Sequence, residues 1–470
     1  MDDRRWTIED RVPTPSDLFL SADLTEDQAR AYLQSLGFRD AAAVDEHLQR
    51  MADDLVAREA LGRLAPDLLP AILESPNPDG AVAAIAQYVA SRSGRAMFLD
   101  YLREDPRALH VLTYVMGASP PLGDILVRTP EYFHWLVAQV ERSAPDRQDH
   151  EEELVSAFAA IDDPLEGLNM LRRWKRREML RIGTRDLLRH ETVPTASAQL
   201  SDVAAVAIDF TLAIVMQQQL DAASRAKPPG TFAVIGAGSL GGREMGYGAA
   251  VELLYVYDAK TANVADASAA GEFFVKVGHA LTAALADERG DGPLYSVVLP
   301  QSAQVEGGLR AASLAAYSQH YATADDLGER LALTRARPIA GDADLGARFM
   351  AACQPFVYRD RPPEPVAAQV GHADRAAYEV EALTQAFQLA YGSRHAALRS
   401  AGTLGTLEEL ARIRLLPEHV CRELDHAYVF LRTAEHRGQL GLRDVDIEKQ
   451  ALASQARVRE ISKSIGRLAD

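Results

Sequence analysis

Four glycines in this chain are spaced in a way that could serve phosphate chemistry. Gly236, Gly238, Gly241 and Gly242 follow an apolar run at 232–235, and a second apolar run occupies 253–257. This order predicts a strand, a glycine-rich turn, a short connection and another strand. Because glycine lets backbone N–H groups approach an anion closely, the turn is a candidate phosphate site.

Dinucleotide binding is one chemistry that uses such a turn. Gly236, Gly238 and Gly241 fit the pattern G-x-G-x-x-G, and Asp258 stands where a ribose-binding acid is expected, 22 residues beyond Gly236. A parallel crossover, however, needs a dozen or more residues. Only nine residues separate Gly242 from Glu252, and Gly246 and Gly248 are two of them. The spacing therefore disfavours a Rossmann-type dinucleotide binder.

Nucleotidyl transfer is the second chemistry, and here the match is longer. The segment resembles the glutamine synthetase adenylyltransferase/adenylyl-removing enzyme family, a branch of the nucleotidyltransferases, whose members carry G-x-G-x-L-G-x-x-E and then S-D-x-D. The glycine half is intact. The resemblance implies ATP and Mg²⁺ as cofactors, and it implies a nucleotide-binding set of Gly236, Gly238, Ser239, Gly241, Gly242, Arg243 and Glu244.

The resemblance extends over nearly the whole chain. It resumes in ERLALTRARPIAGDADLG at 329–346 and in YVFLRTAEHRGQL at 428–440. A second copy of the glycine motif is absent, so the chain resembles a single half of the usual two-copy protein. Glutamine synthetase, or a nitrogen-signalling protein, is the partner that the resemblance implies.

The acidic half of the motif has changed. Where the family carries Ser-Asp-x-Asp, this chain has Ala249, Ala250, Val251 and Glu252. Where the family places a third acid on a later strand, this chain has Val298, and Pro300 and Ser302 replace arginines. Hard divalent cations need carboxylate oxygens, so we expect no metal site here. Glu252 remains as the one catalytic candidate, in a degenerate site with Ala250 and Val298.

Two hypotheses about function follow. The first is a catalytically degenerate regulatory or binding protein of nitrogen metabolism. The second is an active nucleotidyltransferase, adenylylating or deadenylylating glutamine synthetase, with a metal site rewired around Glu252 and acids such as Asp258. Loss of two of three ligands favours the first, because metal-mediated charge stabilisation contributes several kcal/mol to the reaction.

Composition excludes several other classes. The chain has 470 residues and a formal net charge of −17, which argues against wrapping nucleic acid. Cys353 and Cys421 alone cannot form a disulfide framework or a thiolate metal cluster. The charged N-terminus and the lack of a long uninterrupted apolar run predict a cytoplasmic protein without a membrane partner.

The predicted fold is α+β and mostly helical, with a small nucleotidyltransferase-like mixed sheet flanked by helical regions. We expect an N-terminal helical region at 1–226, an α/β domain at 227–360 and a C-terminal helical bundle at 361–470. The strands are predicted at 232–235, 253–257 and 294–299, with Ala250, Glu252 and Val298 together on one face. Residues 329–339 are predicted to form a helix that ends at Pro338.

Three other groups of polar residues have predicted roles. The basic helix at 168–188 should pair its arginines with acids, although Arg177, Arg181 and Arg185 share a face that could meet phosphates. Glu381 and Gln385 match a family helix but, as isolated polar residues, are expected to be solvent-exposed or capping. His426 and His436 are too far apart to share a metal ion.

Overall fold

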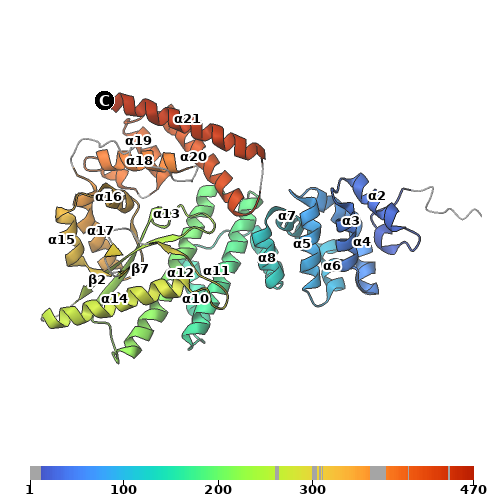
Figure 1. The fold of residues 1–470 in the computed structure, drawn as a ribbon, viewed down its shortest axis with the longest axis horizontal. Coiled ribbons are helices and arrows are strands. Elements are labelled where there is room, and N and C mark those ends of the chain that lie inside the picture. Colours follow the sequence, from blue (N-terminus) through green and yellow to red (C-terminus); the bar gives the residue numbers. More distant parts are fainter. Residues whose placement is uncertain are drawn as a thin grey trace, which may run out of the picture. The chain divides into compact units, whose positions relative to one another are not determined.

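The computed structural model describes residues 12–259, 264–298, 304–305, 308–309, 311–359, 377–400, 402–442 and 445–469. The chain forms two compact units. The first contains the described residues of Met1–Ser143, Met179–Glu191 and Leu440–Arg443, and the second contains those of Ala144–Glu178, Thr192–Gln439 and Asp444–Asp470 (Figure 1). The sheet, the predicted nucleotide-binding residues and the predicted strand-end residues Ala250, Glu252 and Val298 belong to the second unit.

The first unit is built from short helices. Local capping explains where several begin: Thr25 and Gln28 form a capping box, and Asp105 and Ser119 each cap a helix whose first residue is proline. The helices are α1 (Asp17–Leu20), α2 (Glu26–Leu36), α3 (Ala41–Met51), α4 (Leu55–Leu73), α5 (Pro78–Ala90), α6 (Arg95–Glu104), α7 (Pro106–Ala118), α8 (Pro120–Arg128) and α9 (Tyr132–Val140).

The second unit contains the remaining helices. They are α10 (Arg147–Phe158), the larger part of α11 (Pro164–Leu187), α12 (Val193–Ala222), α13 (Gly238–Gly241), α14 (Val264–Ala286), α15 (Leu314–Thr323), α16 (Leu327–Thr334), α17 (Ala343–Val357), α18 (Tyr378–Tyr391), the 3₁₀ helix η4 (Ala396–Arg399), α19 (Thr403–Arg412), α20 (Glu418–Gln439) and α21 (Val445–Ala469).

The sheet of the second unit is small and mixed, as predicted. Its strands are β1 (Gly230–Ala237), β2 (Val251–Ala259), β3 (Val297–Val298), β6 (Ala312–Ser313) and β7 (Arg337–Gly341). Antiparallel pairs join β1 to β2 and β7, whereas β2 runs parallel to β3 and β6. The strands β4 (Gln304–Val305) and β5 (Gly308–Leu309) form a separate pair.

Two sequence predictions are corrected by this topology. The Rossmann alternative is wrong, because β1 and β2 form an antiparallel pair instead of the parallel strands of a crossover unit. The predicted helix at 329–339 is also wrong: α16 ends at Thr334, and 337–341 form β7. Pro338 is tolerated there because β7 pairs with β1 alone, at an edge of the described sheet.

Apolar side chains cover both faces of the sheet. On one face Ile235, Leu254 and Val256 pack with Phe349 of α17 and Tyr317 of α15 in one buried core. On the other face the rings of Phe232 and Tyr257 stack on Phe274 of α14, with centroids 5.7 and 5.1 Å apart. A second core joins α18, α19, α20 and α21. Within the described residues both faces of the sheet are therefore covered, so a ligand would meet the ends or edges of its strands.

The helix α12 is the one described helix that is long and apolar enough to cross a membrane by length and composition. Two-thirds of its most apolar window, 67%, is buried inside the structure. The same length and composition occur in core helices of proteins that span no membrane. Its burial is the behaviour of such a core helix.

The arginines of the basic helix α11 pair with acids, as predicted from the sequence, and they also donate to backbone carbonyl oxygens. In the second unit Arg172 lies 3.3 Å from Asp287, and Arg176 lies 2.6 Å from Asp291. In the first unit the buried Arg185 pairs with Glu191 at 2.7 Å and donates to the carbonyl oxygens of Gln139 and Arg142. Arg185 is thus committed to the carbonyl end of α9 instead of a phosphate.

Lys175 of α11 contacts the residues that precede β3, and its buried charge predicts that the stability of the protein depends on pH. Its ammonium group donates to the carbonyl oxygen of Leu294 and lies 4.0 Å from the ring centroid of Tyr295. Burial lowers the pKa of Lys175 to about 8. The unfolded chain, with an ordinary lysine pKa of about 10.4, therefore binds more protons than the folded chain between these values.

We expect the free energy of unfolding to include a contribution that rises by about 1–3 kcal/mol between pH 8 and pH 10, as Lys175 loses its buried charge. Lys175→Met should lack this rise and should be the more stable protein below pH 8. Urea denaturation of both proteins at several pH values measures the difference. Parallel curves for wild type and variant would contradict the assignment.

Candidate functional site

The end of the sheet brings Glu252 and Val298 together, as predicted. In the parallel pair of β2 and β3, Glu252 is the register partner of Val298, and neighbouring strands lie about 4.8 Å apart. Ala250 immediately precedes β2. The positions that match the family's metal-binding acids therefore gather at one strand end, but an alanine methyl and a valine isopropyl group offer no oxygen to a cation. Pro300 and Ser302 lie outside the described residues.

The carboxylate of Glu252 lies against the glycine turn. Gly238 has a φ of +55°, and a Cβ built on it would stand 2.2 Å from Oε1 of Glu252 and 2.8 Å from Oε2. Only glycine fits, because a side chain here would meet both backbone strain and the carboxylate. Glu252 thus fills space over the turn that an external anion would need.

Two other glycines of the motif serve close packing. A Cβ on Gly241 would stand 1.8 Å from the carbonyl oxygen of Arg335, and one on Gly236 would stand 3.0 Å from Ile339. The glycine turn therefore packs directly against Arg335, which precedes β7, and against Ile339 within β7. These contacts explain both glycines without a nucleotide, so the glycine pattern by itself is weak evidence for one.

Glu244, the last residue of the motif, is the centre of a buried ionic network. Its carboxylate accepts from Arg335 Nη1 at 2.6 Å, from the backbone N–H of Thr403 at 2.6 Å, and from the Thr403 hydroxyl at 3.1 Å. Arg335 follows α16, and Thr403 begins α19. Glu244 thereby joins the glycine turn to the C-terminal helices.

A second carboxylate completes this network and corrects a prediction. Glu381 of α18 is 4% exposed and lies 3.4 Å from Arg335, and Tyr428 of α20 donates to it at 3.5 Å. Gln385 is part-buried and donates to Leu331 and Thr334. The expected solvent exposure of Glu381 and Gln385 is wrong, because tertiary contacts supply partners that their own helix does not show.

The charges in the network stabilise one another. Burial alone would lower the pKa of Arg335, but the carboxylates of Glu244 and Glu381 raise it above its ordinary value. Burial, reinforced by the same two carboxylates, raises the pKa of the Tyr428 hydroxyl. Arg335 is therefore a permanent cation and Tyr428 a neutral donor at physiological pH.

Arg432 of α20 extends the network towards α12. Its guanidinium donates to the carbonyl oxygen of Glu244 at 2.6 Å and to Ser197 at 3.5 Å, and it pairs with Glu435 at 2.7 Å. His436 is buried and lies 3.2 Å from the Ser197 hydroxyl. His436 is therefore a packed side chain, as its isolated position in the sequence suggested.

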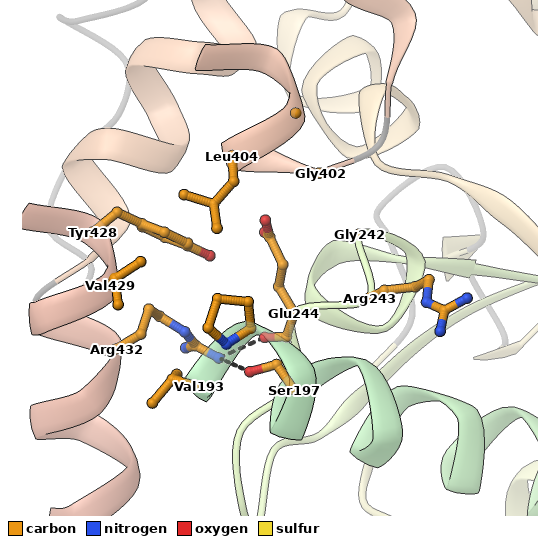
Figure 2. Close-up of a pocket in the computed structure, with 12 residues that line it drawn as sticks. Val193, Ser197, Gly242, Arg243, Glu244, Gly402, Leu404, Tyr428, Val429 and Arg432 are labelled. Atoms are coloured by element: carbon orange, nitrogen blue, oxygen red, sulfur yellow. Dashed lines mark hydrogen bonds between the residues drawn. The ribbon is translucent and has the colours of Figure 1, made fainter. Parts of the chain in front are cut away.

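A pocket of about 170 Å³ adjoins this network (Figure 2). It is lined by Val193, Pro194, Ser197, Gly242, Arg243, Glu244, Gly402, Leu404, Gly405, Tyr428, Val429 and Arg432. Ligand pockets usually measure about 300–1,000 Å³. This one is too small to enclose a nucleotide.

The predicted nucleotide-binding residues are divided by the structure. Gly242, Arg243 and Glu244 line the pocket, whereas Gly236, Gly238, Ser239 and Gly241 do not. Arg243 is half-exposed and pairs with Asp202 of α12 at 2.6 Å. Figure 2 shows its side chain directed away from Arg432 and Tyr428. Three residues of the set therefore line this pocket, and the other four lie outside its lining.

Sequence reasoning missed the roles of Arg335, Thr403, Tyr428 and Arg432. Arg335 lies within 329–346 and the last two within 428–440, segments that had already been matched to the family. That match was the available signal. It gave no role, because the partners are distant in the sequence: Glu244 lies 91, 159 and 188 residues from Arg335, Thr403 and Arg432, and Glu381 lies 47 residues from Tyr428.

Comparisons with known proteins show which family the chain resembles. Residues 109–352 match the model of a family described as glutamate-ammonia ligase adenylyltransferase, and residues 378–466 match that of GlnD PII-uridylyltransferase. Curated relatives include the bifunctional glutamine synthetase adenylyltransferase/adenylyl-removing enzymes of Thioalkalivibrio sulfidiphilus (strain HL-EbGR7), 28% identical over 93% of this chain, and Nocardia farcinica (strain IFM 10152), 30% identical over 71%.

The matched relatives are longer than this chain. The alignment covers 49% of the Thioalkalivibrio protein, 33% of the Nocardia protein and 42% of the Mycobacterium leprae (strain TN) protein, which is 28% identical over 86% of this chain. The chain thus spans about half the length of such relatives, or less. This agrees with the single glycine motif in the sequence.

Proposed function

The chain belongs to the glutamate-ammonia ligase adenylyltransferase family, and from this premise we propose that it is a catalytically degenerate regulatory or binding protein of nitrogen metabolism. It corresponds to one half of the bifunctional enzyme. Its α/β part, 227–360, acts as a scaffold, and its helical parts, 1–226 and 361–470, carry the contacts with a partner in the cytoplasm. Glutamine synthetase, which the names of its relatives contain, is the proposed partner.

The observation that carries this proposal is the strand end at Glu252. A two-metal site needs several carboxylates within reach of both ions. Here the register partner of Glu252 is Val298, and the carboxylate of Glu252 itself packs on Gly238. One carboxylate turned towards the glycine turn cannot hold two metal ions over a triphosphate.

The alternative, an active enzyme with a rewired metal site, requires other acids near Glu252. Asp258 was the named candidate. It lies six residues further along β2, which is about 20 Å at the usual rise of a strand, and it pairs with Arg348 of α17 at 2.8 Å. Its position supports the degenerate function over the rewired one.

An assay of AMP transfer tests the proposal. Purified full-length chain, supplied with ATP, phosphate, Mg²⁺ or Mn²⁺ and glutamine synthetase, should neither adenylylate nor deadenylylate the synthetase above background. The reason is the shortage of oxygen ligands at Ala250 and Val298. Robust turnover by the wild type that disappears in Glu252→Ala would establish the rewired enzyme instead.

Nucleotide binding is tested separately from turnover. In calorimetric titrations with ATP, any binding by the wild type should be indifferent to Mg²⁺, because the proposed scaffold has no metal site. Glu252→Ala should bind ATP more tightly than the wild type, since it clears the carboxylate from Gly238. Tight binding that requires Mg²⁺ would argue for the active enzyme.

The proposed partner is tested by sedimentation of the chain with purified glutamine synthetase.

A further inference from the structure

Three potential metal ligands meet between α10 and α11, away from the residues discussed above. His150 and Glu153 stand at i and i+3 on α10, so they share one face of that helix, and Glu178 approaches from α11. One ligand atom from each residue lies within 4.8 Å of the other two. All three residues belong to the second unit.

The ligand atoms combine one imidazole with two carboxylates. His150 is 2% exposed and Glu178 is 1% exposed, whereas Glu153 is open to solvent. An ion could therefore enter on the Glu153 side and be held on the other by two buried side chains. Imidazole with carboxylates suits a borderline divalent transition metal such as Zn²⁺, and three protein ligands leave one position for water.

The surroundings hold the carboxylates in place. Trp174 donates from Nε1 to Glu153 at 3.3 Å. Arg177 donates to both oxygens of Glu153, at 2.6 and 2.8 Å, and to Oε1 of Glu178 at 2.9 Å. Such hydrogen bonds to ligating carboxylates are the usual outer shell of a metal site. The ring of Trp174 meets that of His150 edge-on, with centroids 5.3 Å apart.

Arg177 already contacts both carboxylates, at 2.6 Å from Glu153 and 2.9 Å from Glu178. A carboxylate oxygen has more than one lone pair, so each carboxylate can accept from Arg177 and also bind a metal ion. The third ligand would be the neutral imidazole of His150, because that is the form that ligates metals.

We propose that His150, Glu153 and Glu178 form a binding site for a divalent transition metal ion of the Zn²⁺ class. The site uses none of the residues at the strand end of Glu252, so it stands independently of the proposed loss of catalysis. The three ligands come from α10 and from the part of α11 that lies in the second unit. A bound ion would therefore be a structural ion that holds these two helical segments together.

The experiment is a Zn²⁺ titration of the full chain after removal of metal with a chelator. We expect one Zn²⁺ to bind per chain with micromolar or tighter affinity, and the melting temperature to rise with Zn²⁺ concentration, as binding to the folded state requires. His150→Gln and Glu178→Gln should each weaken binding at least tenfold. Glu152→Gln, on the same helix but outside the trio, is the matched control and should bind as the wild type does.

Trp174 supplies a readout that reports directly on an ion at His150, because the two rings have centroids 5.3 Å apart. Co²⁺, used as a paramagnetic probe in place of Zn²⁺, should quench Trp174 fluorescence in the wild type and in Glu152→Gln, and should not do so in His150→Gln. Trp174→Phe should remove the quenched component. If Zn²⁺ does not bind, or binds equally well to His150→Gln, the proposal is overturned and the trio is part of an ion-paired cluster around Arg177.

Discussion

Replacement of Glu244 by alanine is expected to lower the free energy of unfolding by about 3–5 kcal/mol, the usual cost of breaking a buried ion pair from one side. The side chain of Arg335 is 5% exposed, and Glu244 is its nearest carboxylate at 2.6 Å. Glu381, at 3.4 Å, is a poorer substitute. The variant also leaves the Thr403 N–H without its 2.6 Å acceptor at the start of α19.

Urea denaturation followed by circular dichroism measures this loss. Glu418→Ala is the control, because Glu418 forms an exposed pair with Arg422 at 3.8 Å, and such pairs contribute at most about 1 kcal/mol. The triple variant Glu244→Ala/Arg335→Met/Glu381→Gln should be more stable than Glu244→Ala alone, since it removes the poorly paired cation without leaving the buried carboxylate of Glu381 unpaired. A loss below about 1 kcal/mol in Glu244→Ala would show that the network does not hold the turn to the C-terminal helices.

The second large effect is expected from restoring the acids. The triple variant Ala250→Asp, Glu252→Asp and Val298→Asp should bind Mn²⁺ at least tenfold more tightly than the wild type at this strand end. The register of β2 with β3 places the carboxylates at 252 and 298 on adjacent strands. Shortening Glu252 by one methylene also withdraws its carboxylate from Gly238, and carboxylate oxygens are the ligands that Mg²⁺ and Mn²⁺ prefer.

Mn²⁺ binding is measured by electron paramagnetic resonance, which counts free ions. The amide triple Ala250→Asn, Glu252→Gln and Val298→Asn is the matched control, because it keeps polarity without charge and should not gain affinity. Turnover should stay low even in the acidic triple, since Pro300 and Ser302 stand where relatives are expected to carry arginines. Equal Mn²⁺ binding by the acidic triple and the wild type would show that these positions do not converge as a metal site.

The residues themselves determined much about this protein. The apolar runs around the glycine turn predicted β1 and β2, because alternation and turn chemistry are local properties. The family, the mostly helical α+β fold and the strand pair of Glu252 with Val298 were also predicted correctly. The sequence alone also shows that Ala250 and Val298 have no side-chain oxygen that could bind a cation.

Only the tertiary structure decided what the polar residues of the motif do. Glu244 reads as part of a nucleotide-binding loop, yet its partners Arg335, Thr403 and Arg432 lie 91, 159 and 188 residues away. No periodicity within a helix or strand encodes such contacts. The strand β7 is a second example. Its residues were predicted to be helical from the sequence, but they form a strand because they pair with β1. Burial and pairing are set by elements distant in the sequence, so a polar residue's role follows from the neighbours that folding brings to it.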